Sequence, residues 1–192
     1  MASPAATFAV FRLSITALVF GMAIGVVSAI PRDAGAERFG AWTVETADGW
    51  VHASTMSASG DTLFHSCHLT KNGCLWALAL YKVPCQVGLK YPLLVNAGTE
   101  ATAVEAWCLG ALGKNKMAYR YGFRDYGLIA RLATNTPRIG VAFPVSREAF
   151  RIMQFNAAGV ASVISATRAL AESRAAASRQ TKDQTERLQE HD

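Results

Sequence analysis

A chain of 192 residues with 51% hydrophobic residues is long enough for one domain with a buried core and too short for several. The formal net charge is +5, and between Lys114 and Arg151 eight basic residues stand against two acidic ones. Such an excess attracts anionic lipid, polysaccharide or nucleic acid, although a solvated surface on an ordinary basic protein is the simpler interpretation.

Residues 1–36 have the order of a secretory signal peptide. Arg12 precedes the apolar run "LSITALVFGMAIGVVSAI", from Leu13 to Ile30, and small residues follow it. We predict cleavage after Ala36 or after Ala29, and prefer Ala36 because the resulting start, "ERFGAW", leads directly into a strand. The alternative is an uncleaved anchor, since about 18 apolar residues approach the length of a membrane span. No later segment is apolar enough to span a membrane.

Removal of residues 1–36 leaves 156 residues with a net charge of +4. The predicted location is the periplasm or the outside of the cell. No cysteine stands at the cleavage site, which argues against a lipoprotein.

From residue 37 to residue 172 the pattern is that of one β-rich domain. Short alternating or apolar segments are separated by turns, which is typical of antiparallel strands. We predict strands over Ala41–Glu45, Trp50–Met56, Thr62–Leu69, Leu75–Tyr81, Leu93–Asn96, Thr102–Leu109, Met117–Phe123, Arg138–Ser146 and Ala149–Phe155. A short helix capped by Asp125 is predicted before Pro137.

The domain ends in a longer predicted helix with Asn156 as its N-cap. From Ala157 onward, apolar and small residues recur at helical spacing: Val160, Val163, Ile164, Thr167, Leu170 and Ala171. Residues 173–192 form a polar tail, either frayed helix or disordered. The fold class is therefore α+β and mainly β: an antiparallel sheet or sandwich of about seven to nine short strands, with the C-terminal helix packed on it.

The four cysteines form an even set in a chain predicted to be exported, and in that setting cysteines form disulfides. Of the three pairings, we predict Cys67–Cys74 and Cys85–Cys108, each stabilising the fold by about 2–4 kcal/mol. The first needs a loop wider than the two-residue turn that "Asn72-Gly73" favours, because a tight turn places Cys67 about 13 Å along the strand from Cys74.

A zinc site of His65, Cys67, His68 and Cys74 is the alternative use of these sulfurs. In an extended segment, however, His65 and Cys67 share one face while His68 lies on the other. The spacing is not that of a zinc finger, and a Cys-x-x-Cys redox motif is absent. We therefore predict no metal and no other cofactor.

Sequence patterns typical of enzymes are absent, including the glycine-rich dinucleotide and Walker patterns, His-Glu-x-x-His and Gly-x-Ser-x-Gly. His52 with Ser54 or Ser66 would be a serine–histidine pair, but a chain of this size offers such pairs by chance. Glu100, Glu105 and Asp125 are interpreted as turn and surface charges. We predict no catalytic residues and no enzymatic activity.

The candidate binding surface combines basic and aromatic residues: Arg120, Arg124, Arg131, Tyr119 and Tyr121. Aromatic residues beside arginines can stack on a sugar or base. The simpler interpretation of the aromatic residues, including Trp42, Trp50, Trp76 and Trp107, is core packing. Nucleic acid is not the expected partner of an exported protein, so the expected partners are an envelope or host protein, or an anionic polysaccharide or lipid.

Two segments, "RFGAWTV" near the mature start and "IGVAFPVSREAF" late in the chain, with cysteines between them, resemble the invasion-associated locus B family of exported Gram-negative proteins. The resemblance implies a small β-rich domain with a periplasmic or surface role, including host interaction, and no catalytic residues. The chain departs from the family in two ways. "WTVETADGW" lacks the cysteine that commonly follows the opening strand, and the long C-terminal helix is additional.

These observations favour a small exported binding module, without catalysis, in the envelope or secreted from the cell. A second hypothesis is an inhibitor or scaffold of another envelope protein that docks through the C-terminal helix, which requires the stripe from Val160 to Leu170 to be uncovered. A third is a hydrolase of the cell wall or of a polysaccharide, which requires a deep pocket with convergent histidines or carboxylates.

Overall fold

The computed structural model describes residues 37–189 except 72, 114 and 116. The predicted signal peptide and both of its cleavage sites lie outside the described residues. No helix in the described part of the chain has the length and apolar character needed to cross a membrane.

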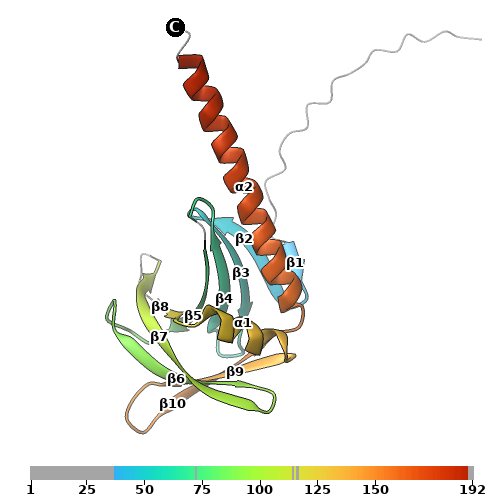
Figure 1. The fold of residues 1–192 in the computed structure, drawn as a ribbon. Helices are drawn as coiled ribbons and strands as arrows, with labels where there is room; N and C mark the ends of the chain where they lie inside the picture. The colour runs from blue at the N-terminus through green and yellow to red at the C-terminus, as the bar shows by residue number, and fades with distance from the viewer. Residues whose placement is uncertain (1–36, 72, 114, 116, 190–192) are drawn as a thin grey trace, which may run out of the picture. The chain divides into compact units, whose positions relative to one another are not determined.

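Ten strands and two helices make up the described residues (Figure 1). The strands are β1 (Glu37–Phe39), β2 (Trp42–Ala47), β3 (Trp50–Met56), β4 (Thr62–His68), β5 (Cys74–Tyr81), β6 (Lys90–Ala97), β7 (Glu100–Leu112), β8 (Ala118–Phe123), β9 (Arg138–Pro144) and β10 (Phe150–Asn156). The helices are α1 (Tyr126–Thr134) and α2 (Val160–Gln189). The strand not predicted from the sequence is β1, whose three residues pair with β2.

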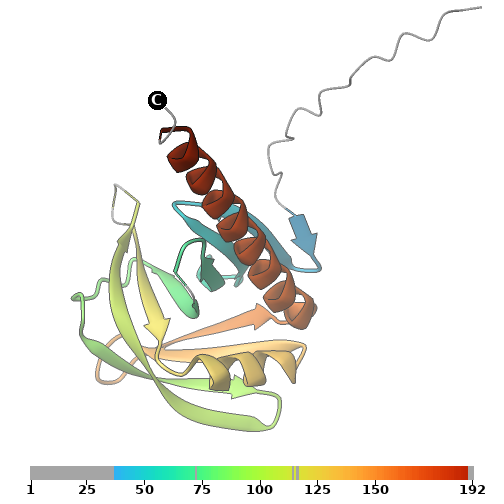
Figure 2. The same cartoon turned by 45° about the horizontal axis from the view of Figure 1, so that its top comes forward.

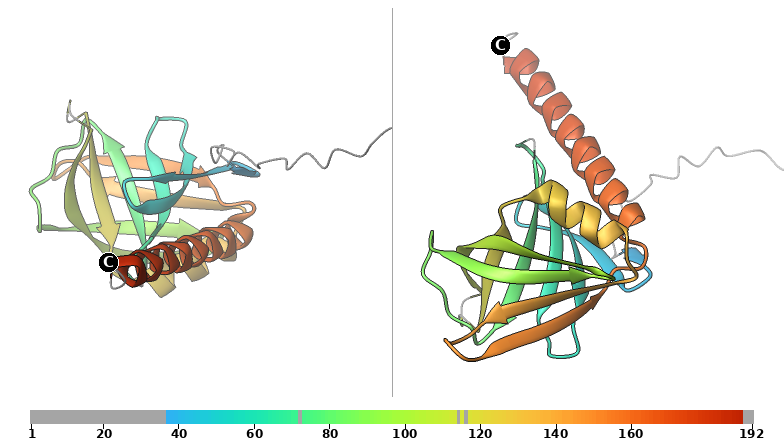
Figure 3. Two further views of the ribbon diagram at one scale, coloured as in Figure 1. Left: turned by 90° about the horizontal axis from the view of Figure 1, so that it is seen from above. Right: turned by 60° about the horizontal axis from the view of Figure 1, so that its bottom comes forward.

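All ten strands belong to one antiparallel sheet, in the order β1-β2-β3-β4-β5-β8-β7-β6-β9-β10. The sheet curls strongly, so that the edge strand β10 comes close to β3 (Figure 3). The predicted mainly β fold, an antiparallel sheet with a C-terminal helix packed on it, is confirmed. Curling lets one continuous sheet enclose its own core, so that a second sheet is not needed.

The core lies on the inner side of this curl. Its largest fully buried side chains include Trp42, Trp76, Tyr121, Phe143 and Phe155, from β2, β5, β8, β9 and β10. Side chains alternate between the two sides of a strand, so each of these strands supplies every second residue to the core. The burial of Trp42 and Trp76 agrees with the interpretation of these tryptophans as core residues.

An ion pair closes the curl between two segments that are far apart in the sequence. Arg151 in β10 donates to Asp61 Oδ1 at 3.1 Å and to the carbonyl oxygen of Tyr81 at 2.7 Å. Asp61 is fully buried and also accepts a hydrogen bond from the Tyr81 N–H at 2.9 Å. A buried carboxylate needs such partners because its desolvation is costly. Arg151 therefore holds the last strand against β4 and β5.

Helix α2 packs its first turns on β1 to β4 and then extends beyond the sheet (Figure 2). Val160, Val163, Thr167 and Ala171 are buried, as the predicted stripe requires. The helix starts later than predicted: Asn156 Oδ1 accepts a hydrogen bond from the Ala158 N–H, but the helix itself begins at Val160. The residues after Ser173 are helical as far as Gln189. With 30 residues, α2 has a length of about 45 Å.

The cysteines form two disulfides, Cys67–Cys74 and Cys85–Cys108, in the pairing we predicted. Cys67 lies directly opposite Cys74 in the β4–β5 register, with Cα atoms 4.1 Å apart. This register requires the wider of the two loops considered for the turn. The second disulfide joins the β5–β6 connection to β7.

Candidate functional site

The binding surface predicted around β8 is divided between the two sides of the sheet. Tyr119 and Tyr121 point to the core side, and Arg120 lies on the opposite side because side chains alternate along a strand. Tyr121 is fully buried, and its hydroxyl donates to the carbonyl oxygen of Val83 at 3.1 Å. Burial raises the pKa of this hydroxyl above its ordinary value. The inclusion of Tyr121 in an exposed surface was therefore wrong.

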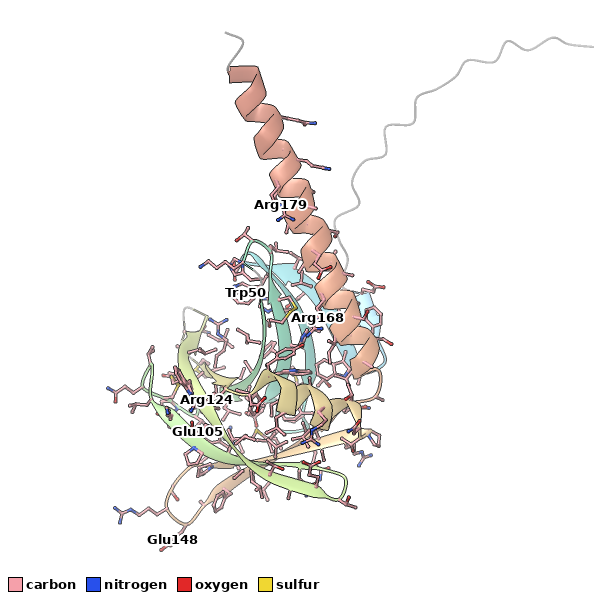
Figure 4. The ribbon with its side chains drawn as sticks, viewed as in Figure 1. Trp50, Glu105, Arg124, Glu148, Arg168 and Arg179 are labelled. Carbon is pink, nitrogen blue, oxygen red and sulfur yellow. A yellow bond between two sulfur atoms is a disulfide. The ribbon has the colours of Figure 1, made fainter. Side chains whose placement is uncertain are left out.

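The two other predicted arginines are exposed but engaged with carboxylates. Arg124 lies 3.2 Å from Glu105 (Figure 4). Arg131 in α1 donates two hydrogen bonds to Glu100, at 2.9 and 3.0 Å. These hydrogen bonds, together with the positive charge of Arg131, lower the pKa of Glu100. Asp125, the third acid, caps α1 by accepting from the Leu128 N–H. The charges of Arg124 and Arg131 are thus compensated by carboxylates.

A different basic site lies between α2 and the β4–β5 hairpin. It is a groove of about 410 Å³, which we call the basic groove. Its charged lining residues are Arg168, Glu172 and Arg179 from α2 and Lys71 from the hairpin. No ion pair joins Arg168, Arg179 or Lys71 to a carboxylate among the side chains that the structure describes. The groove therefore holds three cations against one carboxylate.

Helical spacing puts the α2 residues of the groove on one face. Arg168, Glu172, Ala175 and Arg179 stand at positions i, i+4, i+7 and i+11. Arg168 lies near the sheet, and Arg179 lies on the part of α2 that extends beyond it (Figure 4). The hairpin loop, with the Cys67–Cys74 disulfide at its base, provides the other wall. This disulfide therefore shapes the wall of the groove.

A chain of hydrogen bonds runs from Arg168 at the surface to buried residues beneath it. Arg168 Nη2 lies 2.9 Å from the Tyr126 hydroxyl, and its guanidinium lies 5.4 Å from the centre of the Tyr126 ring. Tyr126 in turn lies 2.9 Å from His65 Nε2, and His65 Nδ1 lies 2.8 Å from Thr167 Oγ1. Thr167 donates to the carbonyl oxygen of Val163. We call Arg168, Tyr126, His65 and Thr167 the histidine network.

One arrangement of hydrogens satisfies every bond of the histidine network with His65 neutral. Arg168 can only donate, so the Tyr126 oxygen accepts from it, and the Tyr126 hydrogen is available for His65 Nε2. Thr167 uses its hydrogen on a backbone carbonyl, so its oxygen accepts from His65 Nδ1–H. His65 is then neutral. Burial, and secondarily the charge of Arg168, lower its pKa to about 4, which agrees with this assignment.

The sulfurs of the predicted zinc alternative are not free to bind a metal. His65 lies with Cys67 and Cys74 in one cluster whose ligand atoms are all within 4.8 Å of one another. The two sulfurs are bonded to each other, and both His65 nitrogens have hydrogen-bond partners. His68 lies apart from this cluster, and its Nδ1 accepts from the backbone N–H groups of Thr70 and Lys71.

A serine and a histidine do meet on the outer side of the sheet. His52 Nδ1 lies 2.8 Å from Ser66 Oγ, and burial lowers the pKa of His52. Glu45 lies opposite His52 on the next strand. Ser66 is buried, however, and no hydrogen bond joins His52 to a carboxylate among the described residues. A hydrolase needs an accessible nucleophile and an oriented base, and this pair provides neither.

The chain has a weak structural resemblance to a protein of known structure. That protein is invasion associated protein B from Bartonella henselae. The two share 10% sequence identity with a TM-score of 0.49, over 70% of this chain and 96% of that one. No family model matches the chain, and no curated protein matches it. The resemblance agrees with the one that the two sequence segments suggested.

The sequence prediction missed the basic groove because its residues come from three separate segments. Tyr126 precedes Arg168 by 42 positions, and His65 precedes Thr167 by 102. One signal was present in the sequence: Arg168 and Arg179 share a helical face that also carries Ala175. The apolar stripe that a docking helix must expose is buried instead, from Val160 to Ala171. This burial removes the stripe as a docking surface.

Proposed function

We propose that the protein is an exported, non-catalytic binding module of the cell envelope, and that the basic groove binds an anionic ligand. The observation that carries the proposal is the difference in charge pairing. Arg168 and Arg179 have no described carboxylate partner, whereas Arg124 and Arg131 do. Cations that are not compensated internally are available to a ligand.

Arginine suits this role chemically. Its planar guanidinium offers five N–H donors and binds carboxylate or phosphate oxygens in pairs. Arg168 uses Nη2 for Tyr126, and further donors of the same group remain for a ligand. The histidine network orients Arg168 before binding, which reduces the entropy lost on association.

Two matched double variants test the groove. The first variant, Arg168→Gln with Arg179→Gln, removes two groove charges. The second, Arg124→Gln with Arg131→Gln, removes two charges from the area of the Arg124–Glu105 and Arg131–Glu100 pairs, which we call the ion-paired region. We expect the first pair to weaken binding to a polyuronate-coated sensor by about tenfold and the second to change it by less than about twofold. Equal losses in both would show that binding follows total charge and would contradict the proposal.

Export is tested separately. The two disulfides suit an oxidising compartment. We expect cell fractionation to place the protein in the periplasm or medium, with a mature start after Ala36 or Ala29. The four cysteines should be unreactive toward a thiol reagent until the protein is reduced. An intact precursor in the cytosol with reactive thiols would contradict export.

A further inference from the structure

We propose that the ligand of the basic groove is an extended acidic polysaccharide that contacts Arg168 and Arg179 through separate anionic groups. This inference rests on the proposed function and adds the class and length of the ligand to it. It follows from the distance between the two arginines, from the carboxylate between them, and from the absence of large exposed apolar side chains in the described lining of the groove.

The first argument is distance. Arg168 and Arg179 are 11 residues apart on α2, which corresponds to about 16 Å along the helix axis and about 20° around it. They therefore lie on the same face, but one carboxylate or phosphate group cannot contact both. A ligand that uses both must carry at least two anionic groups on a chain of that length.

The second argument is the position of Glu172, one turn from Arg168 on the side toward Arg179. A carboxylate at this place repels a ligand of continuous negative charge. It accepts hydrogen bonds, however, from hydroxyl groups that lie between two anionic groups. Sugars of an acidic polysaccharide supply both kinds of group. Ala171 and Ala175 beside it leave room for such a chain to approach the helix.

The third argument distinguishes a polysaccharide from an anionic membrane. Amphipathic helices that bind a membrane surface insert apolar side chains between the lipids. The large exposed apolar residues of the described chain, among them Phe150 and Ile152, lie elsewhere, and none of them lines the basic groove. A recess between a helix and a hairpin suits a chain better than a plane of headgroups.

Arg168 and Arg179 should act differently within the site. Arg168 is held by Tyr126 and so forms an anchor for one anionic group. Arg179 adds a contact that only a long ligand makes. Lys71, on the hairpin wall, is available to the same ligand. Length dependence is therefore the property that separates this proposal from simple anion binding.

The experiment measures binding of the full-length mature protein to digalacturonate and to an oligogalacturonate of about a dozen sugars, at low ionic strength, with neutral dextran as the uncharged control. We expect the long oligomer to bind at least about tenfold more tightly at equal total uronate. Arg179→Gln should weaken binding of the long oligomer about three- to fivefold and leave the dimer unchanged. Arg168→Gln should weaken both, and Glu172→Gln should not weaken either.

Each other outcome has a defined meaning. The dimer and the long oligomer could bind with equal affinity, and Arg168→Gln could abolish both. That result would overturn the proposal of an extended ligand but would leave the proposal of an anion-binding groove in place. Binding to phosphatidylglycerol vesicles, but not to the oligomer, through the same arginines would overturn the polysaccharide in favour of a membrane. Binding that is unchanged in Arg168→Gln would overturn both proposals. Circular dichroism and Arg168→Lys, which keeps the charge, control for a folding defect.

Discussion

Two pairs of arginines in this domain differ in what surrounds them. Arg124 and Arg131 lie beside Glu105 and Glu100, and Lys90 also approaches Glu105 at 3.6 Å. Arg168 and Arg179 line a groove without a described ion-pair partner. The first pair lies in the segment from Lys114 to Arg151, where eight basic residues stand against two acidic ones. Charge density along the chain therefore does not identify the charges that are available for binding.

The reason is that the tertiary fold brings two carboxylates of β7, Glu105 and Glu100, to Arg124 after β8 and to Arg131 in α1. The ion pair of Arg124 with Glu105 joins residues 19 apart: Glu105 lies in β7, and Arg124 directly follows the neighbouring strand β8. Such exposed pairs contribute little to stability, typically about 0.2–1 kcal/mol, but they cancel charge locally. Among the described residues, no strand supplies such a partner to Arg168 or Arg179 on α2. The following predictions test this contrast between the basic groove and the ion-paired region.

The largest effect is expected at His65, which supports the groove from within. His65→Ala leaves a cavity and two hydroxyls, of Tyr126 and Thr167, without their partner. We expect the free energy of unfolding to fall by about 4 kcal/mol, measured by urea denaturation at neutral pH. Arg131→Gln, which breaks an exposed ion pair, should cost less than about 1 kcal/mol. A small loss in His65→Ala would show that the histidine network does not hold α2.

The two disulfides can be removed separately, and the two expected losses of stability are of similar size. Their partners are 7 and 23 residues apart, so loop-closure entropy predicts losses of about 2.5 kcal/mol for Cys67→Ser with Cys74→Ser and about 3.5 kcal/mol for Cys85→Ser with Cys108→Ser. Only the first pair lines the groove. Removal of the Cys67–Cys74 disulfide should therefore weaken polyuronate binding, although it is the less destabilising of the two changes. The reverse order of binding losses would contradict the assignment of the hairpin as a groove wall.

Stability should depend on pH through His65. Its pKa is about 4 when folded and about 6.5 when unfolded. Below pH 6.5 the unfolded chain takes up a proton that the folded chain does not, so stability falls between pH 6.5 and pH 4, by about 3 kcal/mol at most. Glu100 affects stability at lower pH than His65 does. Its pKa is lowered in the folded state, so its contribution to the free energy of unfolding is lost as pH falls through that folded pKa. Urea denaturation of wild type and of His65→Gln at pH 7 and pH 4 measures how much the free energy of unfolding falls between the two pH values. This fall should be smaller in the variant.

The smallest effect is a gain of binding in the ion-paired region. Glu100→Gln with Glu105→Gln removes the carboxylates from Arg131 and Arg124. We expect a weak second polyuronate site, with apparent affinity at low ionic strength raised by about two- to threefold. Raising the salt concentration should abolish the gain. No gain at low salt would show that the groove's shape matters and that unpaired charge alone does not make a site.

Local patterns predicted much of the fold. Nine of the ten strands and the Asp125 cap follow from alternation and turn residues. The even number of cysteines indicated disulfides, and the pairing that we chose among the three is the one in the structure. The failures lie where a local pattern has two interpretations. Asn156 can cap a helix or form a turn before one, and it forms the turn. Tyr121 can be a stacking surface or a core residue, and the alternation of β8 places it in the core.

The sequence by itself determined the periodicity of the elements, because the spacing of apolar residues and turns depends only on neighbours along the chain. It could not show that His65, Tyr126 and Thr167 meet, or that Arg151 contacts Asp61, since these contacts depend on how the sheet curls and where α2 crosses it. The same folding brings carboxylates to Arg124 and Arg131 and none of those described to Arg168 and Arg179. Which arginines are compensated was decided only by the tertiary structure, because ion pairing acts over a few ångströms in space whatever the separation in sequence.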